Sequence, residues 1–299
     1  MSLDPNLLIA GLGLVAVSYL LALTWKLIRL RRLRAAMAPR PQAKIAPSML
    51  MAAHQSSAPV QVAAGNAKTI AIIHDFGLPY GQQSDERMYL SVREAFEVLA
   101  QIRSVGKETP IEIILHTPGG SAFACELIAS ALKDRPNTTA YVPYCAMSAG
   151  TIIALATEKV VMGRYACLGP IDTQYDIFPA ESFKRLLKEK PIQNMDDITV
   201  LLAYQAEKDL KNARERACEL LNKKHSGNDD ACQLTDFLVS GDMPHSEQIN
   251  RERAIQFGVN VAKEDCPDAV YRLVESRLSL LRSSDGRGGL GPDLKAKPD

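Results

Sequence analysis

The stretches that decide the fold are IEIILHTPGG, residues 111–120, and TAYVPYCAMSAG, residues 139–150. In each, a short apolar or β-branched run is followed by a turn of small residues, as expected where a buried parallel strand ends. Directly after the second turn, residues 151–156 have the length and alanine content of a helix. Ser148 is therefore predicted to lie at a strand-to-helix turn.

Ser148 is the candidate nucleophile. A helix N-terminus presents unpaired N–H groups and a partial positive charge to the group that such a serine attacks. Because strand-end loops of one parallel sheet lie side by side, the amides of Gly119, Gly120 and Ala149 are expected to converge beside the Ser148 hydroxyl. A turn serine without a chemical role would fit Ser148 taken alone, but the combined pattern predicts a nucleophile with an oxyanion hole.

The composition is that of an ordinary globular protein. The chain has 299 residues, a formal net charge of +1 and 46% hydrophobic residues, which gives no indication of nucleic-acid binding or disorder. Its six cysteines show no Cys-x-x-Cys spacing, and there is no Gly-x-x-x-x-Gly-Lys-Ser/Thr phosphate loop. We therefore expect no metal site, disulfide framework or cofactor, no nucleic-acid partner, and no ATP bound by this chain.

Alternating strand and helix patterns continue on both sides of the deciding stretches, which predicts a parallel sheet with helical crossovers. The expected strands are 69–74, 111–115, 139–142 and 159–162, and the expected helices are 86–105, 122–132, 180–190, 196–224 and 268–281. In the first helix, the residues predicted to face the sheet are Met88, Val92, Phe96, Leu99 and Ile102.

The N-terminus has the pattern of a membrane anchor. Leu7 to Trp25 is a run of nineteen uncharged residues, long enough to cross a bilayer. Basic residues follow the run directly, so the positive-inside rule places the rest of the chain in the cytoplasm. We expect an extracytoplasmic segment at 1–6, a transmembrane helix at 7–28, a basic and then flexible linker at 29–67, a peptidase domain at 68–282 and a disordered tail at 283–299.

Three motifs carry a resemblance to a known family. The motifs are the His116–Gly120 turn, the Ala146–Gly150 turn and Leu168-Gly169-Pro170-Ile171-Asp172-Thr173-Gln174. Together they resemble the Clp-fold serine peptidases, closest to the serine dehydrogenase proteinase family, which is related to signal peptide peptidase A. The resemblance implies an α/β fold of the Clp protease/crotonase type, with a parallel sheet surrounded by helices. It also implies hydrolysis of protein or peptide substrates and assembly into a homo-oligomer.

The general base is the open point. Clp protease has a histidine in the region matching 168–174, and this chain has none there. That departure points to the Ser-Lys dyad of signal peptide peptidase A relatives, and Lys208 is favoured because its helix can reach back over the sheet. The secondary candidates are Lys188, Lys190, His116, His245 and Asp172. Each of these also fits a purely structural or solvated role.

The sequence therefore predicts a serine endopeptidase anchored by a single helix in the cell (inner) membrane, with its catalytic domain in the cytoplasm. Two alternatives stay open. One is a non-catalytic oligomeric membrane scaffold that retains the Clp fold, which the lack of an obvious histidine base would favour. The other is a crotonase-like acyl-CoA enzyme, which shares the paired-amide oxyanion hole.

Overall fold

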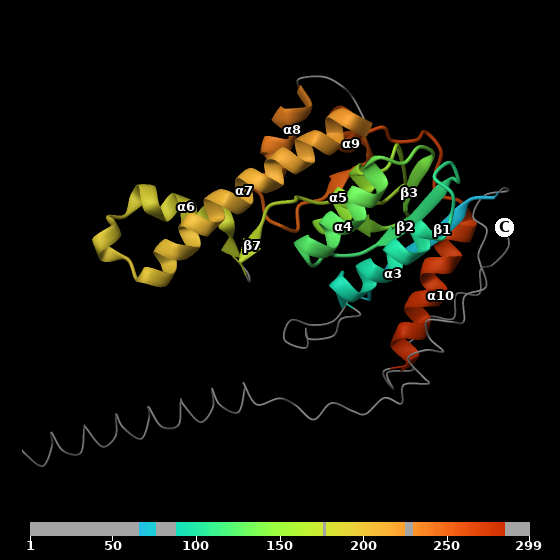
Figure 1. Cartoon of the computed structure of the whole chain (residues 1–299), viewed down its shortest axis with the longest axis horizontal. Helices are drawn as coiled ribbons and strands as arrows, with labels where there is room; N and C mark the ends of the chain where they lie inside the picture. Colours follow the sequence, from blue (N-terminus) through green and yellow to red (C-terminus); the bar gives the residue numbers. More distant parts are fainter. Residues whose placement is uncertain (1–65, 76–87, 176–177, 225–229, 285–299) are drawn as a thin grey trace, which may run out of the picture. The chain divides into compact units, whose positions relative to one another are not determined.

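The computed structural model describes residues 66–75, 88–175, 178–224 and 230–284 (Figure 1). The membrane helix predicted at 7–28, almost all of the predicted linker and most of the predicted tail lie outside these residues. Within the described ranges, no helix combines the length and the apolar character needed to span a bilayer.

A parallel sheet of four strands, in the order β1-β2-β3-β5, forms the centre of the described domain. Its strands are β1 (Lys68–Ile73), β2 (Ile111–His116), β3 (Thr138–Val142) and β5 (Lys159–Met162). The helices between them are α3 (Val92–Arg103), α4 (Ala122–Lys133) and α5 (Ala149–Leu155). This alternation confirms the predicted strand and helix order.

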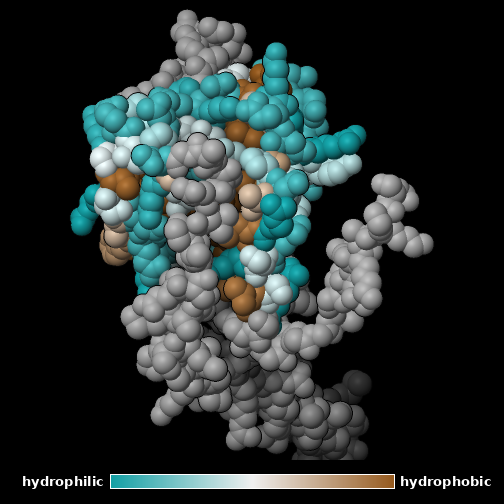
Figure 2. Space-filling view, turned by 90° about the vertical axis from the view of Figure 1, so that its right-hand side faces the viewer, coloured by the Kyte–Doolittle hydropathy of each residue, from teal (hydrophilic) through white to brown (hydrophobic). Residues whose placement is uncertain are grey.

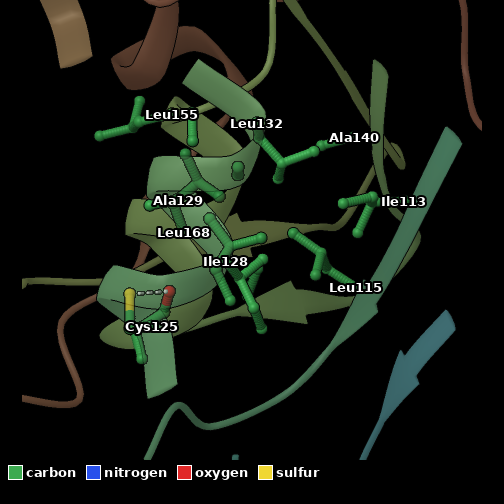
Figure 3. Close-up of a cluster of buried hydrophobic side chains, with 14 of the residues drawn as sticks. Ile113, Leu115, Cys125, Ile128, Ala129, Leu132, Ala140, Leu155 and Leu168 are labelled. Carbon is green, nitrogen blue, oxygen red and sulfur yellow. Dashed lines mark hydrogen bonds between the residues drawn. The ribbon is translucent and has the colours of Figure 1, made fainter. Parts of the chain in front are cut away.

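Both faces of the sheet are covered, because successive side chains of a strand point to opposite faces. Ile113 and Leu115 of β2 join the cluster that α4 covers with Ile128 and Leu132, all fully buried (Figure 3). Ile114, between them in sequence, joins a second cluster that includes residues of α10 (Asp268–Ser284). The continuous apolar run of β2 is therefore explained by burial on two sides.

A second, smaller sheet lies where the strand-end turns are found. It contains β4 (Cys145–Ala146), β6 (Cys167–Leu168) and β9 (Ile249–Asn250), in that order. β4 and β6 are parallel, whereas β9 runs antiparallel to β6. The chain thus returns from about eighty residues further on to complete this sheet.

The remaining elements follow β6. They are β7 (Gln174–Tyr175), β8 (Phe178–Pro179), α6 (Ala180–Glu189), the 3-10 turn η2 (Ile192–Asn194), α7 (Asp197–Lys224), α8 (Asp230–Val239) and α9 (Arg251–Gln256). In Figure 1, α6 and the adjoining end of α7 lie away from the central sheet. The packed contact there is made by Ala180, Ala206 and Leu210.

Two details differ from the expectations. Met88, Val92 and Ile102 lie against the core as predicted, but Phe96 is 58% exposed and Ala95 is buried. Cys218 is disulfide-bonded, so the expectation that the cysteines form no disulfide is wrong at that position. Spacing alone could not reveal this bond, because disulfides join residues that only the fold brings together.

Candidate active site

Ser148 has a strained backbone. Its φ of 51° and ψ of −116° lie in a region that residues other than glycine rarely adopt, and it stands between β4 and α5. The strand-to-helix turn predicted from sequence is therefore present. A strained serine at such a turn is the arrangement of a nucleophile elbow, in which the hydroxyl is held clear of the backbone. The Ser148 side chain does not cap α5 and makes no hydrogen bond with the described residues.

The Gly119-Gly120 turn packs directly against Ser148. A Cβ atom built on Gly119 would lie 2.7 Å from Ser148 Cβ and 3.0 Å from the amide nitrogen of Ala149, and Gly119 has a φ of 106°. Only glycine therefore fits at this position, both for its conformation and for the space available. The fold has brought together the two turns that sequence analysis paired.

The three predicted oxyanion-hole amides are not equivalent. The Gly119 N–H donates a hydrogen bond to Thr117 Oγ1 at 3.1 Å. The N–H groups of Gly120 and Ala149 donate no hydrogen bond within the part of the chain that the structure describes. Cys125 fixes the first turn of α5 by donating from Sγ to the Ala149 carbonyl at 3.3 Å (Figure 3). Gly120 and Ala149 are therefore the two amides available to stabilise an oxyanion.

Thr151 connects the Ser148 helix to the loop after β6. Its Oγ1 accepts a hydrogen bond from the Gly169 N–H at 3.0 Å and lies 2.8 Å from the Ala146 carbonyl, to which it can donate. Thr151 is 1% exposed, so this contact belongs to the rigid interior. The loop that starts at Gly169 is thus held beside α5, and it carries Asp172.

Asp172 and His245 form a close pair. His245 Nδ1 lies 2.7 Å from Asp172 Oδ1, the Asp172 side chain is 1% exposed and that of His245 is 34% exposed. Asp172 also accepts a hydrogen bond from the Gln174 amide. The His245 Nε2 atom makes no hydrogen bond with the described residues. A buried carboxylate that orients an imidazole and leaves its second nitrogen open is the base-and-orienter arrangement of serine hydrolases.

The small sheet brings this pair to the same edge as the serine. Ser148 comes two residues after β4 ends, and Asp172 comes four residues after the parallel strand β6 ends. His245 comes four residues before β9, which runs antiparallel to β6, so it also lies at that edge. Three candidates from distant parts of the sequence therefore share one edge of one sheet.

The predicted lysines lie on the surface. Lys208 is on an exposed face of α7, in the stretch that packs on α6, and Lys188 and Lys190 are exposed at the end of α6. Among the described residues, no hydrogen bond or ion pair joins any of the three to the Ser148 turn. Lys208 as the base stays a prediction.

His116 lies at the end of β2 in a packed setting. Its ring makes an edge contact with Tyr144, and its Nδ1 is 3.7 Å from Cys145 Sγ. Burial, assisted by the neighbouring His74, lowers the pKa of His116 to about 4. The ring is therefore neutral at physiological pH, and burial likewise raises the pKa of the adjacent Cys145 thiol to about 12, which makes it a poor nucleophile.

One polar cluster was missed at the level of sequence. His74 is 2% exposed, and its two ring nitrogens contact Thr117 and Glu94. These residues stand 43 and 20 positions away from His74, and the histidine simply ends an apolar strand. Only its polarity at a buried strand end could have drawn attention to it.

Comparison with known proteins gives one family. The family of ClpP-like SDH-type serine proteinases matches residues 50–284. The uncharacterized protein MJ0137 of Methanocaldococcus jannaschii is 36% identical over 217 residues, which are 70% of this chain and 73% of that protein. MJ1495 of the same organism is 34% identical over 188 residues, 62% of this chain and 63% of that protein, so this chain spans slightly under two thirds of its length.

Solved structures give more distant likenesses. A serine-to-alanine mutant of the 1510-N membrane-bound stomatin-specific protease has 18% identity and a TM-score of 0.44, covering 68% of this chain and 82% of that chain. ClpP1 from Listeria monocytogenes has 16% identity and a TM-score of 0.43, covering 66% of this chain and 92% of that chain.

Proposed function

Because the chain belongs to the ClpP-like SDH-type serine proteinase family and is therefore a serine peptidase, we propose that Ser148 is its nucleophile and that it is a membrane-anchored endopeptidase. The observation that carries the choice of Ser148 is its strained φ of 51° at a turn packed against Gly119. Backbone strain of this kind costs about 1–3 kcal/mol and concentrates at functional sites. The family assignment favours a peptidase over the scaffold and acyl-CoA alternatives.

The proposed base is His245, oriented by Asp172. Nε2 takes the hydroxyl proton of Ser148 while Oγ bonds to the peptide carbonyl carbon, and the carbonyl oxygen becomes an oxyanion held by the amides of Gly120 and Ala149. The proton then passes to the departing amine as the C–N bond breaks. Water then attacks the acyl-enzyme. His245 takes a proton from the water and returns it to Ser148 Oγ as the acyl group leaves, which regenerates the serine.

The hydrogen bond of 2.7 Å between His245 and Asp172 supports this choice of base, because it fixes the imidazole with its proton on Nδ1 and a lone pair on Nε2. Ser148 Oγ and His245 Nε2 are not hydrogen-bonded to each other, so the two groups must close together when substrate binds. Lys208 is the alternative base; it is exposed on α7, and no hydrogen bond among the described residues joins it to the serine.

The membrane anchor is supported by the uncharged run at 7–25 and the basic residues that follow it. On this proposal the anchor is a single helix at 7–28, the linker reaches to residue 67, and the peptidase domain works in the cytoplasm at the inner membrane. Its substrates are proteins or peptides that reach the membrane surface.

Assembly into a homo-oligomer is supported by exposed apolar side chains around α6 and α7. They are Phe178, Ile192, Ile198, Leu201 and Tyr204. In Figure 2, which views the domain from another side, the coloured surface is mainly hydrophilic with several hydrophobic patches between. Leu201→Glu combined with Ile198→Glu should lower the mass measured by light scattering, whereas Leu280→Glu, at an exposed position on α10, should not.

The deciding experiment is covalent labelling of the full chain with a fluorophosphonate. Wild type should form a stable adduct at Ser148, seen by mass spectrometry, and should hydrolyse fluorescein-labelled casein. Ser148→Ala should lose both, while Ser130→Ala, which removes an exposed serine of α4, should keep both. Labelling or hydrolysis that survives in Ser148→Ala would remove the proposal.

A further inference from the structure

A row of hydrogen-bonded polar side chains, Glu94, His74 and Thr117, leads to the Gly119-Gly120 turn. His74 follows β1 directly and is 2% exposed, its Nδ1 lies 2.8 Å from Thr117 Oγ1, and its Nε2 lies 2.9 Å from Glu94 Oε2. A buried imidazole with both nitrogens engaged is held in one orientation. The proposed reaction uses none of these three side chains to transfer a proton or to attack.

Thr117 is the member of this hydrogen-bonded row that contacts the active-site turns. Its N–H donates to the Cys145 carbonyl at 3.1 Å, and its own carbonyl accepts from the Met147 N–H at 2.9 Å. Its methyl group occupies the space beside Gly150, where an added Cβ would lie 2.6 Å from Thr117 Cγ2. One residue just after β2 therefore touches both the Gly-Gly turn and the serine turn.

The donor and acceptor of each hydrogen bond in this row are fixed by its two ends, because the Gly119 N–H can only donate and the Glu94 carboxylate can only accept. The Gly119 N–H must donate to Thr117 Oγ1, at 3.1 Å. The Thr117 hydroxyl hydrogen then points to His74 Nδ1, because the alternative acceptor, the Gly119 carbonyl, is 3.5 Å away. His74 accordingly carries its own proton on Nε2 and donates it to the Glu94 carboxylate.

Glu94 therefore sets the direction of all three hydrogen bonds. Because its carboxylate only accepts, His74 carries its proton on Nε2, and His74 Nδ1 then accepts from the Thr117 hydroxyl. A lone pair on Thr117 Oγ1 is left to accept from the Gly119 N–H. With that amide tied back, the next peptide unit is fixed in the orientation that it takes beside Ser148. Resting on the proposed function, we propose that Glu94, His74 and Thr117 are positioning residues that hold the Gly119-Gly120 turn in its oxyanion-binding form.

The kinetics of fluorophosphonate labelling distinguish a residue that positions the oxyanion hole from one that only stabilises the fold. In that reaction the serine oxygen bonds to phosphorus while its proton passes to the proposed base, the P–F bond breaks and fluoride leaves, and the phosphoryl oxygen takes the place of the oxyanion. The limiting rate kinact reports that step, whereas the constant KI reports binding. A misplaced oxyanion hole lowers kinact and leaves KI unchanged.

Thr117→Val keeps the shape of the side chain but removes the hydroxyl. In the full chain we expect kinact to fall about 10- to 100-fold, with KI within about twofold of wild type. Thr117→Ser restores the oxygen and should return kinact to within about threefold of wild type. The matched control is Thr138→Val, which removes another buried threonine hydroxyl, at 1% exposure, from the far end of β3 and should label at the wild-type rate.

A folded Thr117→Val protein with wild-type kinact would overturn the inference, as would an equal loss in Thr138→Val. If Thr117→Val does not fold, Glu94→Leu decides, because the Glu94 side chain is 26% exposed and tolerates change. Glu94→Leu should lower kinact, and Glu94→Gln, which can still accept from His74, should retain it; a wild-type rate in Glu94→Leu would refute the positioning role. Failure of the proposed function itself would appear differently, as labelling that persists in Ser148→Ala.

Discussion

Replacing Asp172 by asparagine tests the proposed base while changing almost nothing in shape. The carboxylate is 1% exposed and lies 2.7 Å from His245 Nδ1, so an isosteric amide should occupy the same place. Its NH₂ group can donate to Nδ1, which would put the imidazole proton on Nε2. In that tautomer His245 cannot accept the proton of Ser148.

The size of the effect follows from the charge that is lost. When His245 becomes an imidazolium in the transition state, its charge centre lies about 4 Å from that of the carboxylate, which at an effective dielectric constant of about 20 is worth about 4 kcal/mol. That energy corresponds to a loss of about 10³-fold in rate. The wrong tautomer adds to the loss, so we expect a decrease of about 10³- to 10⁴-fold.

The assay is the labelling rate and casein hydrolysis of the full chain across neutral and alkaline pH. Asp209→Asn is a suitable control, since Asp209 also accepts hydrogen bonds, from Tyr175 and Gln205, but lies on α7. Lys208→Met should retain wild-type activity. A fully active Asp172→Asn protein would refute the assignment of His245 and Asp172, and loss of activity confined to Lys208→Met would identify the lysine as the base.

Three further outcomes are expected. Ser148→Gly should unfold in urea with a free energy about 1 kcal/mol higher than Ser148→Ala, because only glycine relieves the strain at φ 51°; equal values would mean that the turn is not strained. Burial keeps the pKa of His116 at about 4, so the unfolded chain binds more protons between about pH 4 and 6.5, and the stability from this group is complete above that range and falls as the pH falls. Wild type should therefore lose about 1–2 kcal/mol more than His116→Gln between about pH 7.5 and 5, and parallel urea curves would contradict this. Removing residues 1–30 should transfer the peptidase from the membrane pellet to the supernatant after centrifugation, and continued sedimentation with membranes would argue against the predicted anchor.

The sequence was most informative where local chemistry decides the structure. Apolar runs ending in Pro118-Gly119-Gly120 and in the Ser148 turn give strand ends directly, because buried parallel strands lack polar residues and tight turns need small ones. The structure confirms both turns and their contact. In the helix predicted at 86–105, Met88, Val92 and Ile102 lie against the core as predicted, whereas Phe96 is exposed and Ala95 is buried. Phe96 and Ala95 are neighbouring apolar residues, so apolar spacing alone does not distinguish them.

The polar partners could not be derived in the same way. Asp172 and His245 are 73 residues apart, and they meet because β9 pairs antiparallel with β6, a two-residue pairing with no periodic signal of its own. Either residue considered alone fits a turn or surface position. The same holds for His74, whose partners come from a helix and from the end of the next strand.

The strain at Ser148 persists because backbone hydrogen bonds hold the turn on both sides. On one side Met147 donates to the Thr117 carbonyl at 2.9 Å, and on the other Thr151 donates to the Ser148 carbonyl at 2.9 Å while Gly150 donates to the Met147 carbonyl at 2.8 Å. Each such bond contributes about 1 kcal/mol, so together they offset a strain of about 1–3 kcal/mol. These bonds are made by Thr117, which follows β2, and by the first turn of α5. The His245 and Asp172 pair instead comes from the loop after β6 and from the segment before β9. The strain on the nucleophile is therefore held by contacts in which the base pair takes no part.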